Sequence, residues 1–188
     1  ACGAARLGLK VAFVGLCGND QFGQFMLSEM CKHDINVEHV VIRDKGSTGL
    51  SVILNRQADR AILTFMGLMD ALSAENISDQ LLAQCRHLHV ASYFLQTRLQ
   101  PELPGLFQRA HQLGLSTSLD SNYDPSEKWS GLADVLPHCD VFLPNEREAL
   151  AITGAHELHV AGQMLSSQAG SVAVKRGADG AVAFQNNQ

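Results

Sequence analysis

Hydrophobic positions in the first third of the chain change their spacing from one segment to the next. A short helical piece is expected at Ala4–Leu7, and the apolar run Val11–Gly15 has the composition of a strand that ends in glycine. In Gln21–Lys32, apolar residues recur at positions 22, 25, 26, 27 and 30, which is the stripe of an amphipathic helix. Asp20 stands where it would cap that helix.

Three segments with strand character follow without a helix between them. They are Val37–Ile42, Leu50–Leu54 and Ala61–Phe65. Gly46-Ser-Thr-Gly49 separates the first two, and Gln57-Ala-Asp59 separates the second and third. Short strands joined by tight turns predict an antiparallel meander.

From Leu81 onward, strands and helices alternate. The helix predicted at Glu102–Leu113 is entered through Pro101 and left at Gly114. The other predicted strands are Leu88–Ala91, Leu115–Leu119, Val141–Leu143, Val172–Lys175 and Ala181–Phe184, and the other helices are Glu146–Ile152 and Leu158–Ser166. This alternation predicts an α/β fold in which helices cover both faces of a mostly parallel sheet.

Composition narrows the classes of partner. The 188 residues suit one domain or slightly more, and the net charge is −5. The 14 Lys and Arg residues form no cluster, so we expect no nucleic-acid partner. The longest uncharged stretch, Leu158–Val174, contains His, Gln, Ser and Gly, so we expect no membrane partner. The five cysteines lack CxxC spacing, which favours free thiols and a cytoplasmic location.

Two patterns could carry chemistry but favour structural roles. Gly15, Gly18 and Gly23 lie at a strand-to-helix junction, yet their spacing fits neither the dinucleotide GxGxxG nor the Walker motif. A tight turn with close backbone packing is therefore favoured, and a nicotinamide-dependent oxidoreductase loses its main support. His87 and His89 share a face of a predicted strand, but no third ligand is adjacent, so structural histidines are favoured over a metal site.

Polar residues appear where the strand predicted at 115–119 ends. Asp120, Asn122 and Asp124 stand beyond its carboxyl end, which is where ligands bind in open parallel sheets. Hydroxyl-rich substrates need such converging donors and acceptors. Asx-turn chemistry before Pro125 explains the same residues equally well.

Two later strand ends are also candidates. Asn145 and Glu148 share a helical face, and an amide with a carboxylate could orient hydrated Mg²⁺ and a polyphosphate. A helix cap with a solvated Glu in the first turn is the alternative. Lys175 precedes Gly177 and Gly180, which would let a backbone turn approach a nucleotide while Lys175 complements phosphate charge. A plain β-turn with a solvated Lys is the rival explanation.

The order of these motifs resembles that of the PfkB/ribokinase family of carbohydrate kinases. Gly15–Gly23 is similar to the family's G-x-x-G-x-D-x-x-G stretch, and Leu119–Pro125 is similar to its central D-x-N segment. Pro144–Gly154 matches the family's P-N-x-x-E … T-G motif, and Val174–Gly180 is similar to its K-x-G-x-x-G turn. Four matches in order cover nearly the whole chain.

The resemblance implies a ribokinase-like, Rossmann-like α/β domain over residues 1–188 with small lid strands at about 37–65. It also implies ATP-dependent phosphorylation of a sugar hydroxyl with Mg²⁺, and a homodimer through the lid. By resemblance, ATP is contacted by Asn145, Lys175, Gly177 and Gly180, Mg²⁺ by Glu148, and the substrate by Asp120, Asn122, Thr48 and Gly49.

The chain also departs from the family pattern. Family members carry a Gly-Gly … Asn sugar-binding stretch upstream and a Gly-Ala-Gly-Asp segment downstream, whose Asp activates the sugar hydroxyl. Neither occurs in residues 1–188, and the chain does not begin with Met. We therefore expect a fragment of a sugar kinase that is inactive alone, with no catalytic base of its own. The alternative is a non-catalytic sugar- or nucleotide-binding or scaffolding protein that keeps the kinase fold.

Overall fold

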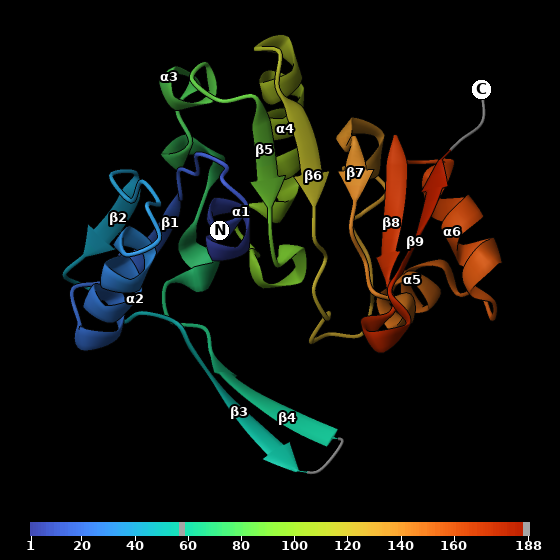
Figure 1. Cartoon of the computed structure of the whole chain (residues 1–188), viewed down its shortest axis with the longest axis horizontal. Helices are drawn as coiled ribbons and strands as arrows, with labels where there is room; N and C mark the ends of the chain where they lie inside the picture. The colour runs from blue at the N-terminus through green and yellow to red at the C-terminus, as the bar shows by residue number, and fades with distance from the viewer. Residues whose placement is uncertain (57–58, 186–188) are drawn as a thin grey trace. The chain divides into compact units, whose positions relative to one another are not determined.

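The computed structural model describes residues 1–56 and 59–185, and the chain divides into two compact units, residues 1–76 and residues 77–188 (Figure 1). Both units combine helices with strands, so the predicted α/β class is confirmed. All five cysteines are free thiols, and burial raises the pKa of Cys139 to about 12. No helix of the described residues is long and apolar enough to cross a bilayer.

The first unit contains a parallel strand pair and an antiparallel hairpin. Its elements are α1 (Cys2–Arg6), β1 (Gly15–Gly18), α2 (Gln21–Cys31), β2 (Val40–Arg43), β3 (Leu50–Arg56) and β4 (Asp59–Phe65), followed by the short 3₁₀ helices Met69–Ala71 and Ala74–Asn76. Asp20 caps α2 as predicted, because its carboxylate accepts a hydrogen bond from the Gly23 amide at 2.8 Å.

Two predictions for this unit are wrong. The first strand lies at Gly15–Gly18 and not at 11–15, where Ala12 makes only an isolated bridge to Asn36. The strand expected to open the meander is β2, and it pairs in parallel with β1. The antiparallel hairpin therefore begins at β3, and β2 is not part of it. The reason is that α2 carries the chain back between β1 and β2, and such a crossover brings the second strand in parallel.

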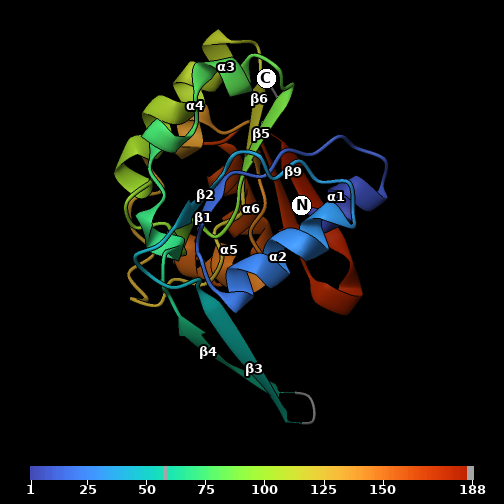
Figure 2. The same ribbon diagram turned by 90° about the vertical axis from the view of Figure 1, so that its left-hand side faces the viewer.

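The strands β3 and β4 form the antiparallel hairpin that the sequence predicts. Leu50 pairs with Phe65, and the ladder continues to the far end of the strands. The predicted turn at 57–59 includes residues 57 and 58, which lie outside the described residues. Figures 1 and 2 show the hairpin extending away from β1, β2 and α2 of the same unit.

The second unit is built on a five-stranded sheet in the order β5-β6-β7-β8-β9. The strands are β5 (His87–Val90), β6 (Ser116–Leu119), β7 (Val141–Phe142), β8 (Ser171–Lys175) and β9 (Ala181–Gln185), and the helices are α3 (Asp79–Leu82), α4 (Leu103–Gln112), α5 (Glu146–Thr153) and α6 (Leu158–Ser166). The first four strands are parallel, and β9 is antiparallel to β8. The predicted mostly parallel sheet is therefore confirmed.

Helices α4, α5 and α6 pack on this sheet and bury its apolar residues. The strand order follows the chain order, and right-handed crossovers then place the connecting helices on the same face. Within this unit, α4, α5 and α6 therefore cover one face of the sheet and not both faces as the sequence predicts. Leu119, Phe142 and Val172 are fully buried and lie beside one another in register. Helix α4 ends before Gly114, whose φ of +83° gives the left-handed exit predicted there. Because β6, β7 and β8 are parallel neighbours, their carboxyl ends lie at one edge of the sheet.

Candidate functional site

Three of the predicted site residues meet at the carboxyl edge of the parallel strands. Asp120 follows β6, Asn145 follows β7 after two residues, and Lys175 ends β8. Because these strands run in the same direction and are neighbours, their ends share one edge. The edge therefore gathers residues up to 55 positions apart in the sequence.

Asp120 and Lys175 form an ion pair across this edge. The Lys175 ammonium donates to the Asp120 carboxylate, and the two side chains are 47% and 29% exposed. The other oxygen of Asp120 accepts from the Asn122 amide at 3.0 Å. Asn122 has a φ of +57°, and its own oxygen accepts from the Tyr123 amide at 2.8 Å. The Asx-turn alternative is thus present in the geometry, together with a charge pair that the sequence analysis did not predict.

Asn145 and Glu148 form a reciprocal capping box at the start of α5. The Glu148 amide donates to the Asn145 side-chain oxygen at 2.9 Å, and the Asn145 amide donates to the Glu148 carboxylate at 2.9 Å. The Asn145 side-chain nitrogen and the Ser121 hydroxyl also donate to that carboxylate, at 2.6 and 3.1 Å. Glu148 is buried, with 5% of its surface exposed. The capping alternative therefore describes the geometry, except that Glu148 is not solvated.

Direct Mg²⁺ coordination does not fit this arrangement. Glu148 accepts three hydrogen bonds inside the protein and has little exposed surface. Within residues 1–56 and 59–185, no group of three His, Cys, Asp or Glu residues is placed to hold a metal ion. Mg²⁺ in phosphate sites keeps several waters and binds phosphates together with few protein ligands. The arrangement instead fits an indirect contribution of Glu148 to a Mg²⁺ site, in which Glu148 orients Asn145 and water molecules bound to the ion.

The turn after β8 is open and depends on glycine. Gly177 and Gly180 have φ values of +59° and +83°, and a Cβ at either position would have no neighbour within 4 Å. The glycines therefore serve backbone conformation and not packing. The Arg176 amide donates to the Gly180 carbonyl at 2.8 Å, and the Arg176 side chain pairs with Glu146 at 3.2 Å.

Asp124 is turned into its own loop. It is buried and accepts hydrogen bonds from the amides of Ser126 and Trp129, at 2.8 and 2.7 Å. Burial opposes its ionisation, but these hydrogen bonds outweigh burial and hold the pKa of Asp124 below its ordinary value of 3.8. Asp124 therefore closes the loop and, unlike Asp120, is not presented at the sheet edge.

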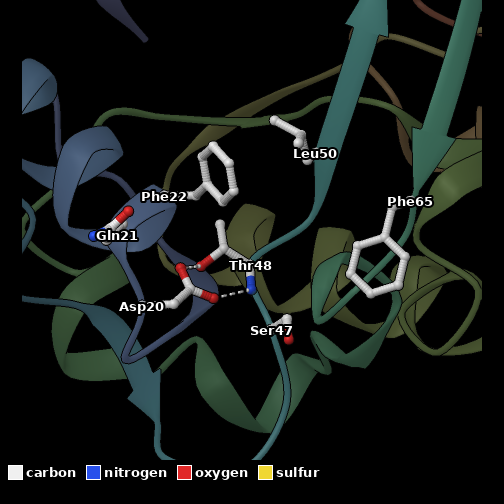
Figure 3. Close-up of a pocket in the computed structure, with 7 residues that line it drawn as sticks. All are labelled: Asp20, Gln21, Phe22, Ser47, Thr48, Leu50 and Phe65. Atoms are coloured by element: carbon white, nitrogen blue, oxygen red, sulfur yellow. Dashed lines mark hydrogen bonds between the residues drawn. The ribbon is translucent and has the colours of Figure 1, made fainter.

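Thr48 and Gly49 belong to the first unit, where Thr48 lines a cavity of about 370 Å³ (Figure 3). Its lining combines polar groups with two aromatic rings: Asp20, Gln21, Phe22, Ser47, Thr48, Leu50 and Phe65. The Asp20 carboxylate accepts from the amide and the hydroxyl of Thr48, both at 2.7 Å. The Thr48 amide leads the hydrogen bonds that lower the pKa of Asp20. Asp20 thus joins the start of α2 to the base of the β3–β4 hairpin.

Glycines make this junction tight, as the sequence analysis favoured. A Cβ on Gly18 would lie 2.9 Å from the Thr48 amide, and one on Gly23 would lie 2.9 Å from the Thr48 hydroxyl. A Cβ on Gly49 would lie 2.6 Å from the Met66 carbonyl. The hydroxyl of Thr48 accepts a hydrogen bond from the Gly18 amide at 2.9 Å and donates one to Asp20. Both bonds anchor the base of the hairpin.

Several features of these sites have no signal in the sequence. Phe22 and Phe65 line the cavity of the first unit and are 54% and 59% exposed. In the sequence, nothing distinguishes either residue from the other apolar positions of its helix or strand. The predicted cap Asp20 has a second partner, Thr48, 28 residues away.

His87 and His89 both contact the Ser118 hydroxyl at 2.7 Å, which agrees with the structural role favoured for them.

Comparisons with known proteins agree with one another. The whole chain, residues 1–188, matches the family described as pfkB family carbohydrate kinase. It is 26% identical over 185 residues to an uncharacterized sugar kinase of Archaeoglobus fulgidus, covering 95% of this chain and 71% of that protein. It is 30% identical over 197 residues to the 2-dehydro-3-deoxygluconokinase of Bacillus subtilis, covering 96% and 60%.

Solved structures share the fold. A putative ribokinase II of E. coli, in complex with ATP and Mg²⁺, superposes with a TM-score of 0.85 at 21% identity, covering 100% of this chain and 63% of that one. The chain thus spans about three fifths of the length of this structure and of the Bacillus relative.

Proposed function

Because this chain belongs to the pfkB family of carbohydrate kinases, we propose that the protein containing it transfers the γ-phosphoryl group of ATP to a sugar hydroxyl. The observation that carries this proposal is the meeting of Asp120, Asn145 and Lys175 at one sheet edge, beside the start of α5. An edge of this kind is where α/β folds bind phosphorylated ligands.

On the nucleotide side, the proposal assigns phosphate contacts to Lys175, Asn145 and the backbone of the turn at Gly177 and Gly180. Lys175 supplies positive charge, and the turn has open space above both glycines. The side-chain amide of Asn145 has two N–H donors and spends one on Glu148, so the second is left for a phosphate oxygen. Glu148 positions Asn145 through the capping box.

In the reaction, the bond between the γ-phosphorus and its bridging oxygen breaks, and a bond from the sugar oxygen forms. Mg²⁺ bound to ATP neutralises phosphate charge in such reactions. The hydroxyl proton must pass to a base, and we assign no residue of 1–188 to that task. On the substrate side we propose contacts from Asp120 and Asn122, and from the lid base at Thr48 and Gly49.

The direct test measures phosphoryl transfer and MgATP binding separately. Residues 1–188 contain no Gly-Ala-Gly-Asp segment, so we expect the chain to bind MgATP but to transfer no phosphate to any sugar of a broad panel. Robust transfer by the 188 residues alone would mean that another residue acts as the base. Absence of MgATP binding at millimolar concentrations would remove the nucleotide site itself.

A non-catalytic binding protein is the second candidate. It is favoured by one observation, that Asn145 and Glu148 already satisfy each other in a helix cap. A longer natural chain carrying the family's downstream segment discriminates the two functions. Turnover by that chain supports the kinase, and nucleotide binding without turnover supports the binding protein.

The β3–β4 hairpin is proposed to support a homodimer. Its apolar side chains are about half exposed on both faces: Val52, Ile53, Leu54, Ile62 and Leu63. Exposed apolar strands tend to pair with another chain. Sedimentation of the wild type against Ile53→Lys tests this proposal, and we expect the substitution to shift the mass from dimer to monomer. A monomeric wild type at tens of micromolar contradicts it.

A further inference from the structure

At the carboxyl edge of the sheet, the Lys175 ammonium is held in an ion pair with Asp120 before any ligand arrives. We propose that Asp120 competes with nucleotide phosphates for Lys175, so that ATP binds only by displacing the Asp120 carboxylate from the Lys175 ammonium. This inference rests on the proposed nucleotide site and adds a control of its affinity. It makes Asp120 a residue that acts on the nucleotide through Lys175.

The backbone of Lys175 is fixed while its side chain is free to change partner. The Lys175 amide donates to the Pro144 carbonyl at 2.9 Å, and its strand pairs with β9 at Ala181. The side chain beyond this anchored backbone is a flexible stem with 47% of its surface exposed. A ligand arriving from solvent can therefore take the ammonium without disturbing the strand.

Asp120 also keeps its place without the ion pair. The Asp120 amide donates to the Val90 carbonyl at 2.9 Å, and the Asp120 carbonyl accepts from the Tyr93 amide at 3.1 Å. One carboxylate oxygen accepts from the Asn122 amide, and only the other binds Lys175. Loss of the pair should therefore release Lys175 and leave the loop after β6 where it is.

The charge arrangement makes competition the expected behaviour. Both cations at the start of the turn after β8 have a carboxylate partner, Lys175 with Asp120 and Arg176 with Glu146. A polyphosphate brings several negative charges and charge-assisted hydrogen bonds to the same ammonium. Half-exposed ion pairs are weak, so the cost of displacing Asp120 is small but measurable as affinity.

The experiment is a calorimetric titration of the 188-residue chain with MgATP and with adenosine at low ionic strength. We compare the wild type with Asp120→Asn, Lys175→Met and the double variant. We expect Asp120→Asn to bind MgATP about two- to fivefold more tightly, as loss of a partly exposed competing pair allows. Lys175→Met should bind more weakly, and Asp120→Asn should have no further effect in that background.

Two controls separate competition from other effects of the substitution. Adenosine has no phosphate, so its affinity should not change in any variant. Asp134→Asn removes the same unit of charge from an exposed position and should leave MgATP affinity unchanged. Asp120→Ser serves as a second release variant if circular dichroism shows that Asp120→Asn does not fold.

The outcomes are distinct. If the wild type binds MgATP and loss of the Asp120 carboxylate leaves affinity unchanged or weaker, the competition is overturned while the proposed function stands. If Asp120→Asn still raises MgATP affinity in the Lys175→Met background, Asp120 does not act through Lys175, and the inference is also wrong. If no variant binds MgATP, the nucleotide site and the inference fail together.

Discussion

Glu148→Gln tests whether the Asn145–Glu148 pair at the start of α5 has a structural role. The substitution keeps the size of the side chain and replaces a buried carboxylate with an amide. Glutamate at this position accepts two bonds on one oxygen, from the Asn145 amide and the Ser121 hydroxyl, and one bond on the other, from the Asn145 side chain. Glutamine has only one accepting oxygen.

The expected loss of stability follows from these partners. In the best arrangement, the Gln oxygen keeps the two donors, and its NH₂ group faces the NH₂ group of Asn145. Asn145 cannot turn over to relieve this, because its oxygen accepts from the residue 148 amide as the helix cap. One donor is left without an acceptor beside a buried side chain, which costs about 1.5–3 kcal/mol for a bond to a charged group.

Glu146→Gln is the matched control, since it is the same substitution two residues earlier in α5. Glu146 is 40% exposed and pairs with Arg176, so its loss should cost less than about 1 kcal/mol. Urea unfolding without nucleotide, followed by the fluorescence of the single tryptophan, Trp129, measures both variants in the unit that contains α5. Equal stabilities of the two variants, within about 0.5 kcal/mol, would refute the reasoning.

Three further predictions concern stability. Thr48→Val should cost about 1–3 kcal/mol because it removes the acceptor of the buried Gly18 amide, whereas Thr48→Ser keeps the hydroxyl and should cost about 0.8 kcal/mol for one methyl group. Chemical unfolding followed by circular dichroism compares the two variants, and equal losses of stability would contradict the role of the hydroxyl. In the second unit, Gly162→Ala should destabilise by about 1–3 kcal/mol less the helix-propensity gain, because its Cβ would overlap the Phe184 ring of β9. Gly105→Ala meets no atom within 4 Å and should stabilise by up to about 1 kcal/mol, and the same sign for both substitutions in urea melts would disprove the packing argument. Because the pKa of Asp124 lies below its ordinary 3.8, its contribution to stability is complete above pH 3.8 and is lost as the pH falls through the lowered pKa. Asp124→Asn should therefore be less stable than the wild type at pH 7 and should lose less unfolding free energy on acidification. A variant whose stability falls with pH as steeply as that of the wild type would count against this account.

Local features of this protein could be predicted from the sequence alone. Asp20 and Asn145 were predicted as helix caps, and Gly114 as a helix exit, because each depends on backbone groups within a few residues. The alternating segments after residue 81 were predicted nearly to their ends, because the spacing of apolar residues reflects the period of the element itself. The order of the glycine, Asn-Glu and Lys-Gly motifs indicated the family.

Other features depended on which segments become neighbours in space. The periodicity of β2 is that of any strand, and only the crossover through α2 decides that it pairs in parallel with β1 and not with the hairpin. The ion pair of Asp120 with Lys175 joins residues 55 positions apart, and its existence depends on the order of the strands in the sheet. Glu148 reads as a solvated first-turn residue, and burial against Ser121 makes it a structural acceptor. The sequence indicates which groups can hydrogen-bond within a few residues of each other, whereas strand order and register decide which groups far apart in the sequence come into contact.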